Sequence, residues 1–358
     1  MQRGFGAGIA VALGLVWTAA HAEEAARPLR LIGETGASDK GGTPRRFVID
    51  ARVKPGDGEF QSTLEGWFAG LDDNPPAGAI EGSCVEKHCA FTVTAEDGKM
   101  SFTGDYLDAA GPVTAHFTIK DEDDKVTGQG DTTLRPLSGA IAGFGPLAAP
   151  DAIDAGGLDD LLLWSHQSVP AGERAGEPVG DSQREALADW QKAQGRAGTG
   201  LLFTSDLAQL SVDAAAAKAG AGWTALGDAG HGWAAGYPAA VLPQAGHDGG
   251  QQRFASADGK AVLVIAIETP MSEADFDALV ERETADNTAR SDVGYNRVNG
   301  DMDLHYQEQG VVHLLAWHNR EGGLARMSFA YPASVAEAYE PYGAVLSASF
   351  QVSDELKR

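Results

Sequence analysis

The sequence predicts an α+β chain with several domains: an N-terminal all-β sandwich or barrel, a small helical segment, and a C-terminal antiparallel sheet with packed helices. Three observations predict this fold class. Residues 23–150 alternate short apolar runs with Gly, Pro and Asp, residues 151–215 show helical periodicity, and residues 216–358 combine both patterns. The 358 residues are enough for two or three domains of ordinary size.

The first 22 residues have the pattern of a secretory signal peptide. Arg3 precedes an apolar stretch over 5–17. Ala20 and Ala22 then form a small-residue cleavage site ahead of Glu23. A membrane anchor is the alternative, but the apolar stretch is shorter than the roughly 20 residues that a span needs. We therefore expect a periplasmic or secreted mature chain with no membrane insertion after signal cleavage.

Seven short β-type runs separated by turn residues predict the sandwich or barrel of residues 23–150. Phe91 and Val93 alternate with Thr92 and Thr94, which is typical of a half-buried strand. The predicted strands cover 29–32, 47–53, 62–68, 90–94, 101–106, 114–119 and 127–134.

The two cysteines of the chain, Cys84 and Cys89, both fall in this β region. In an oxidising compartment we expect them to form a local disulfide that pins a turn between two strands. A metal site is the weaker interpretation, because two thiolates and His88 leave a structural zinc ion one ligand short.

A helix is predicted over 183–194, because Ser182 and Glu185 have the spacing of a capping box. The pair Trp190-Gln191 lies near the end of this helix. A glycine turn, a Thr-Gly step and a second helix with two leucines follow, at Gly195, Thr199, Gly200, Leu207 and Leu210.

Over residues 182–210 this arrangement resembles the second half of the small three-helix peptidoglycan-binding domain. The resemblance implies a helical fold in which Trp190 and Gln191 contact a peptidoglycan ligand. In the alternative interpretation, residues 151–215 form a helical linker domain in which Trp190 is merely a core residue.

The C-terminal region, residues 216–358, is predicted to contain a hairpin, a helix, four strands and a closing helix. Asp258 and Gly259 form the hairpin turn, Ser272 is the N-cap of the first helix, and Pro341 is expected to break the closing helix over 334–350. The predicted strands cover 252–256, 261–268, 294–298, 302–307, 311–319 and 324–331.

This order of elements resembles PsbP-like domains, in which helices pack on an antiparallel sheet. Tyr331-Pro332 after the last strand and Ser349-Phe350 near the end of the chain also fit the resemblance. It implies a docking or delivery role more than a catalytic one.

Asp301, Asp303 and His305 alternate along one predicted strand, so their side chains share one face. Carboxylate and imidazole groups of this kind can bind a divalent metal ion. In the alternative interpretation they form a solvated face, with Met302 and Leu304 on the core side. His313 on the next strand shares its face with Leu315 and Trp317, which favours a position away from Asp303.

An aromatic and histidine cluster in a Gly-rich stretch is the other candidate binding surface. It consists of Trp223, His231, Trp233, Tyr237 and His247. Aromatic side chains in loops can stack on sugar rings or fill a peptide groove. Equally, Trp233 and Tyr237 fit the first strand of the C-terminal domain, where they would be buried.

The charge and the motifs limit the possible functions. Acidic side chains outnumber basic ones by 51 to 27, a net charge of −24 that disfavours nucleic acid as a partner. No nucleophile elbow, HExxH motif or phosphate-binding loop is visible, and no cofactor is predicted.

The sequence therefore favours an exported cell-envelope binding protein, associated with peptidoglycan or an envelope protein and without an evident catalytic site. The alternatives are an envelope hydrolase and a small-ligand or metal carrier. A hydrolase is expected to bury a carboxylate pair in a cleft, whereas a binding module is expected to leave an uncharged apolar patch.

Overall fold

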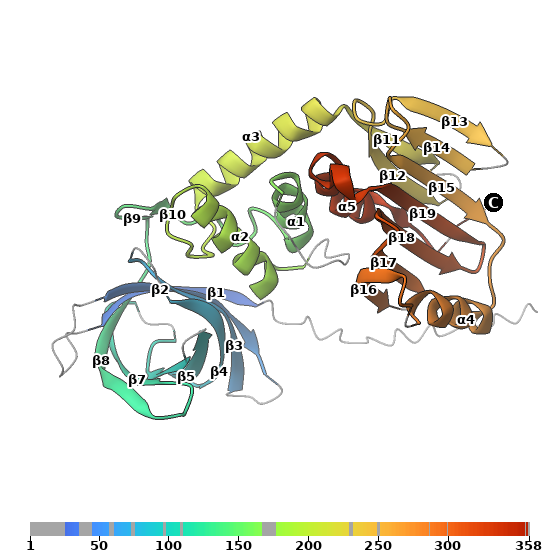
Figure 1. Cartoon of the computed structure of the whole chain (residues 1–358). Helices are drawn as coiled ribbons and strands as arrows, with labels where there is room; N and C mark the ends of the chain where they lie inside the picture. The colour runs from blue at the N-terminus through green and yellow to red at the C-terminus, as the bar shows by residue number, and fades with distance from the viewer. Residues whose placement is uncertain are drawn as a thin grey trace, which may run out of the picture.

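The computed structural model describes residues 26–356, apart from 36–44, 57–60, 73–75, 96–97, 108–109, 167–176, 229–231, 249–250, 286, 299 and 355. The predicted signal peptide, residues 1–22, lies outside the described residues. A β-barrel, a group of helices and a C-terminal α+β unit follow one another along the chain (Figure 1). The predicted fold class is confirmed.

Eight strands form a closed antiparallel barrel in the N-terminal unit. Each strand pairs with the next, and β1 also pairs with β8, so the first domain is a barrel and not a sandwich. The strands are β1 (Arg27–Thr35), β2 (Arg45–Pro55), β3 (Gln61–Gly70), β4 (Ala77–Val85), β5 (His88–Ala95), β6 (Gly98–Gly104), β7 (Val113–Lys120) and β8 (Val126–Pro136).

Aromatic side chains fill the barrel interior. The ring centroid of Phe102 lies 4.9–6.3 Å from those of Phe47, Phe68, Phe91 and Phe117. Because side chains alternate along a strand, these large residues face inward while their neighbours face outward.

Strand β4 is absent from the sequence prediction because small residues replace the usual large apolar ones. At Gly82 an added Cβ would lie 2.5 Å from the Cβ of Phe91 and 2.4 Å from Ala90 O, so only glycine fits beside β5. The alternation that identifies the other strands is therefore weak here.

The predicted disulfide between Cys84 and Cys89 is confirmed. The two residues face each other in the β4–β5 hairpin, with Cα atoms 4.0 Å apart, and both side chains are buried in the barrel core. The disulfide thus closes the turn at Glu86 and Lys87.

Three helices follow the barrel: α1 (Ala155–Trp164), α2 (Asp181–Ala193) and α3 (Thr204–Ala221). The predicted helix is present, but the predicted capping box is wrong, because α2 begins before Ser182. The N-cap is Gly180, whose backbone N donates to Oε1 of Gln183 at 3.1 Å. A buried cluster that includes Leu158, Leu187 and Trp190 holds the helices together.

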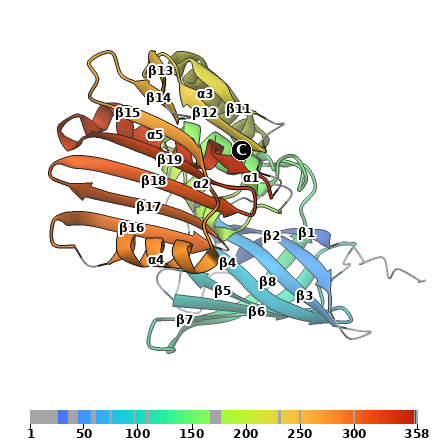
Figure 2. The same cartoon turned by 90° about the vertical axis from the view of Figure 1, so that its right-hand side faces the viewer.

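The C-terminal unit contains two antiparallel sheets (Figure 2). The small sheet has the order β11-β12-β20 and the large one β13-β14-β15-β19-β18-β17-β16. The strands are β11 (Trp223–Asp228), β12 (Trp233–Pro238), β13 (Gln244–Asp248), β14 (Gln251–Ala255), β15 (Val262–Glu268), β16 (Arg290–Val298), β17 (Asp301–Glu308), β18 (Val311–Arg320), β19 (Gly323–Pro332) and β20 (Gln351–Val352).

Two helices cover opposite faces of the large sheet. On one face, Phe276 of α4 (Glu273–Thr284) packs with Met302 and Leu304. On the other face, Leu346 of α5 (Ala336–Ser349) belongs to the same buried cluster as Met327.

The sequence predictions for the two C-terminal helices differ in their outcome. The predicted N-cap of α4 is confirmed, because Ser272 Oγ accepts from the backbone N of Asp275 at 3.1 Å. The predicted break at Pro341 is wrong, since α5 continues through it. A proline removes one backbone donor, and here the packing of Leu346 against the sheet outweighs that loss.

The edge strand β16 is irregular. The pairing register of β16 with β17 shifts between Ser291 and Gly294, which marks a β-bulge. Val293 lies within this shift and Tyr295 follows it, and both side chains are exposed.

Apolar contacts join the units to one another. On the outside of the barrel, Val48 and Trp67 pack against Leu201 and Phe203 of the segment between α2 and α3. Further along the chain, the ring of Trp164 in α1 meets that of Trp223 edge-on, with centroids 4.9 Å apart. In the part of the chain that the structure describes, none of the helices has the length and apolar character that a membrane span requires.

We expect the double substitution Cys84→Ala and Cys89→Ala to lower the free energy of unfolding by about 2 kcal/mol, because the closed loop is short. Chemical denaturation followed by tryptophan fluorescence would measure this. Reduction of the wild-type chain should give a similar loss. A loss near zero in both experiments would contradict the role of the disulfide in closing the hairpin.

Candidate functional site

Trp190 and Gln191, the predicted ligand-contacting pair, are buried in the helical segment. Gln191 Oε1 accepts from the backbone N of Thr199 (2.9 Å) and of Gly200 (3.0 Å). Its Nε2 donates to Leu201 O at 2.9 Å, so this one amide organises the loop between α2 and α3. With relative exposures of 1% and 2%, neither side chain is open to a ligand, and the sequence prediction is corrected to a structural role.

The predicted aromatic surface is largely part of the C-terminal core. Trp233 is buried, Tyr237 packs on Phe254 with ring centroids 4.1 Å apart, and the half-buried Trp223 lies over Gly236, where a Cβ would meet its ring at 2.2 Å. His247 is exposed on β13 and does not join them, while His231 lies outside the described residues. The core interpretation of these aromatics is the one that the packing supports.

Asp301, Asp303 and His305 have separate partners. Asp301 pairs with His318 (2.9 Å) and Arg320 (2.5 Å), and both groups lower its pKa against the opposing effect of burial. Asp303 accepts a hydrogen bond from Ser347 Oγ at 2.7 Å.

The ring of His305 lies against Gly294, where a Cβ would meet its Cε1 at 2.1 Å. His313 is stacked on Tyr306, on the opposite face from Asp303. Among the described residues, no three His, Cys, Asp or Glu side chains converge in a way that could hold a metal ion.

A cleft of about 560 Å³ lies between the barrel and the helical segment. Its floor is the outer face of β1 to β4, and its roof comes from residues 148–153 and 178–184. The floor is charged because the strands place apolar side chains inward and polar ones outward: Ile49, Ala51 and Val53 belong to the barrel core, whereas Asp50 and Arg52 line the cleft.

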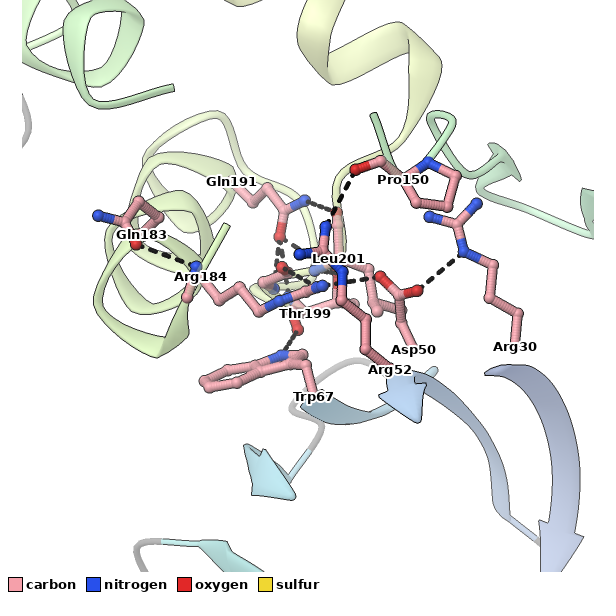
Figure 3. Close-up of polar contacts among 12 residues, drawn as sticks. Arg30, Asp50, Arg52, Trp67, Pro150, Gln183, Arg184, Gln191, Thr199 and Leu201 are labelled. Atoms are coloured by element: carbon pink, nitrogen blue, oxygen red, sulfur yellow. Dashed lines mark hydrogen bonds and ion pairs between the residues drawn. The ribbon is translucent and has the colours of Figure 1, made fainter. Parts of the chain in front are cut away.

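Asp50 lies between two arginines, Arg30 and Arg184, and all three side chains line the cleft (Figure 3). Its Oδ1 accepts from Arg30 Nε and its Oδ2 from Arg184 Nη2, both at 2.8 Å. Burial acts to raise the pKa of Asp50, but the charges and hydrogen bonds of Arg184 and Arg30 outweigh it and leave the pKa below its usual value. Because Arg184 is on α2, this ion pair also attaches the helical segment to β2.

A second polar contact attaches the same two units. Trp67 on β3 donates from Nε1 to Thr199 O at 2.7 Å, and Thr199 is held by Gln191 (Figure 3). Gly200 follows with a positive φ of 65°, and a Cβ there would lie 2.8 Å from Trp67 Nε1. The Thr-Gly step of the sequence is therefore the point where the helical segment contacts the barrel.

Arg52, on the same strand as Asp50, also lines the cleft. Its Nη2 donates to Pro150 O at 3.2 Å (Figure 3). Burial, followed by the neighbouring Arg184, lowers the pKa of the Arg52 guanidinium, and Asp50 partly opposes this. Arg30, Arg52 and Arg184 are thus close enough to influence one another on this side of the cleft.

The opposite side of the cleft is acidic. Glu65 on β3 and Glu81 on β4 face each other in register, and Glu65 also pairs with Lys54 at 2.5 Å. Asp181, at the start of α2, has a pKa that is raised by burial and by Glu185, Glu81 and Glu65, against the effect of Arg184.

The described lining contains no Ser, Cys or His, so its polar chemistry consists of cations, carboxylates and Thr63. The sequence analysis misses this site because its residues come from β1 to β4 and from the chain around α2, with no local motif. Asp50 and Arg52 are the sequence signal that points to the cleft, since they interrupt the apolar run of residues 47–53.

No known protein-family model matches the chain, and no curated protein is significantly similar to it.

Replacing Gln191 with Ala should lower the free energy of unfolding by about 2–4 kcal/mol, because buried groups of Thr199, Gly200 and Leu201 lose their partner. Urea denaturation measures this. The exposed Gln194→Ala at the end of the same helix is the matched control and should cost little. Equal effects of the two substitutions would contradict the structural role of Gln191.

Asp50→Asn should lower the free energy of unfolding by about 3 kcal/mol at pH 7, because Arg30 and Arg184 lose their buried partner. Since the folded pKa of Asp50 lies below its unfolded value of about 4, the difference from wild type should be full above that pH. It should shrink as the pH falls through the folded pKa.

Denaturation of both proteins between pH 7 and pH 2.5 tests this expectation. Asp131→Asn, which changes an exposed barrel carboxylate, is the control for general acid effects. A difference between wild type and Asp50→Asn that stays constant, or grows, toward low pH would contradict the assignment.

Proposed function

We propose that this is an exported, non-catalytic binding protein of the cell envelope, and that it binds peptidoglycan in the cleft between the barrel and the helical segment. The observation that carries this proposal is the cleft itself. It is built jointly by two units that Asp50, Arg184 and Trp67 hold together.

Three further observations support the proposal. The Cys84–Cys89 disulfide is of the kind that forms in an oxidising compartment, which agrees with export. The resemblance of residues 182–210 to peptidoglycan-binding domains favours a cell-wall ligand. The buried carboxylate of the cleft, Asp50, is neutralised by two arginines and has a lowered pKa, so it is not set up as a general acid.

The C-terminal unit has a separate role in this proposal. Its resemblance to PsbP-like domains supports docking to an envelope protein, and Trp164 and Trp223 join it to α1 of the helical segment.

An envelope hydrolase is the second candidate, and one observation favours it. Glu65 and Glu81 face each other in the cleft, and paired carboxylates are what glycoside hydrolysis uses. Both side chains are exposed, whereas a catalytic acid is usually desolvated to raise its pKa. Release of soluble fragments from purified cell walls, lost in Glu81→Gln, would favour this candidate over simple binding.

We expect the mature chain, residues 23–358, to pellet with purified peptidoglycan sacculi, and Ala149→Trp to lose most of this binding. Ala149 is exposed in the cleft, so an indole there fills space that a ligand needs. Co-sedimentation with protein gel quantification measures both.

Thr133→Trp is the matched control, because Thr133 is exposed on β8, away from the cleft. It should pellet like wild type, and circular dichroism should show all three proteins folded. Absence of pelleting by wild type, or equal pelleting by Ala149→Trp, would contradict the proposed function.

A further inference from the structure

Arg52 has no carboxylate partner within ion-pair distance among the described residues. Other cations of the cleft are paired: Arg30 and Arg184 with Asp50, and Lys54 with Glu65. Among the residues that the structure describes, the acceptor for Arg52 is Pro150 O, although a guanidinium carries five donors in a fork that matches a carboxylate. The cleft therefore contains a cation suited to bind an external anion.

The same row of the barrel surface also carries carboxylates. Arg52 on β2 is in register with Glu65 on β3, which is in register with Glu81 on β4. Because neighbouring strands are about 4.8 Å apart, the backbone at Arg52 and that at Glu81 are separated by about 10 Å. Glu81 and Asp181 have no ion-pair partner in the described part of the chain, so one cleft is lined by a cation and by carboxylates that are not paired with each other.

We propose that the cleft binds a zwitterionic peptide, with a carboxylate of the ligand on Arg52 and an ammonium group on Glu81 and Asp181. This inference rests on the proposed function, because it names the part of the cell wall that the cleft recognises. A cell-wall peptide that ends in a diamino acid carries both charges on a single residue.

The balance of charge in the cleft disfavours ligands with only one sign of charge. The lining contains four basic side chains, Arg30, Arg52, Lys54 and Arg184, and four acidic ones, Asp50, Glu65, Glu81 and Asp181. A polyanion would be repelled by the acidic end and a polycation by the basic end. A zwitterion satisfies both ends.

The acidic side of the cleft contains a repulsion that an ammonium group can relieve. Burial and the nearby Glu185, Glu81 and Glu65 raise the pKa of Asp181 although Arg184 acts to lower it, so the protein itself stabilises this carboxylate poorly. An ammonium group placed between Glu81 and Asp181 compensates these charges. The volume of about 560 Å³ lies in the range of sites that bind ligands of a few residues or less.

Isothermal titration calorimetry of residues 23–358 with the tripeptide L-Ala-γ-D-Glu-meso-diaminopimelate tests the proposal. We expect binding by wild type, and at least roughly tenfold weaker binding by Arg52→Gln and by Glu81→Gln, because each removes a charge-assisted contact. Acetylating the amino groups of the peptide, or amidating its carboxyl groups, should weaken binding to wild type by a similar factor. Titration with free diaminopimelate shows whether the peptide or the amino acid alone is the ligand.

Arg135→Gln, on the exposed outer face of β8, is the matched control and should bind like wild type. Thermal unfolding should confirm that all variants are folded. Equal affinity of wild type and Arg52→Gln, or of the free and modified peptides, would overturn the proposal.

The two proposals fail differently. If wild type binds sacculi and Ala149→Trp does not, but wild type fails to bind the tripeptide, the zwitterion assignment is overturned and the proposed function stands. If the tripeptide binds with the expected dependence on Arg52 but sacculi do not pellet the protein, the zwitterion assignment stands and peptidoglycan attachment is wrong.

Discussion

The ion pair of Asp50 with Arg30 and Arg184 is the contact on which the arrangement of barrel and helices depends. A carboxylate on the outside of a barrel is normally solvated, and covering it with a helix costs solvation energy. Arg184 offsets that cost from the covering helix itself, and Arg30 does so from the neighbouring strand. The charges are therefore compensated only when α2 lies on β2, which favours one docking geometry over other apolar packings.

Trp67 and Gln191 extend the same constraint into the helical segment. Gln191 holds the loop that contains Thr199, and Trp67 of the barrel donates a hydrogen bond to the carbonyl oxygen of Thr199. The apolar contacts of Leu201 and Phe203 then fill the space around these bonds. These contacts fix the barrel and the helical segment relative to each other, so the backbone on both sides of the cleft is positioned before a ligand arrives, which lowers the entropy lost on binding.

Much of the fold could be predicted because its signals are local. Alternating side chains identify most barrel strands, the spacing of Cys84 and Cys89 predicts their hairpin, and Ser272 marks the start of α4. β4 could not be predicted because Gly82 makes room for the close approach of Ala90 and Phe91 on β5, a requirement set by another strand.

The candidate site could not be predicted in the same way, because its residues meet only after the barrel closes and α2 docks. Trp190 and Gln191 illustrate the opposite difficulty. A local pattern correctly indicates that they matter, but their hydrogen bonds and burial show that they stabilise the loop and do not face a ligand. A pattern of residue types cannot separate these roles without the neighbours that tertiary structure supplies.

The two β units differ in their exposure to unwanted association. The barrel pairs its first strand with its last, so it offers no open edge. The seven-stranded sheet has two open edges, β13 and β16, and Val293 and Tyr295 are exposed on β16. The bulge between Ser291 and Gly294 interrupts the regular spacing that a second chain would need to add a strand, and charged Arg290 and Arg297 lie on either side of it. Irregular backbone and charge at an edge strand are features that oppose the addition of a further strand, so β16 is a less regular template than its exposed apolar side chains alone would suggest.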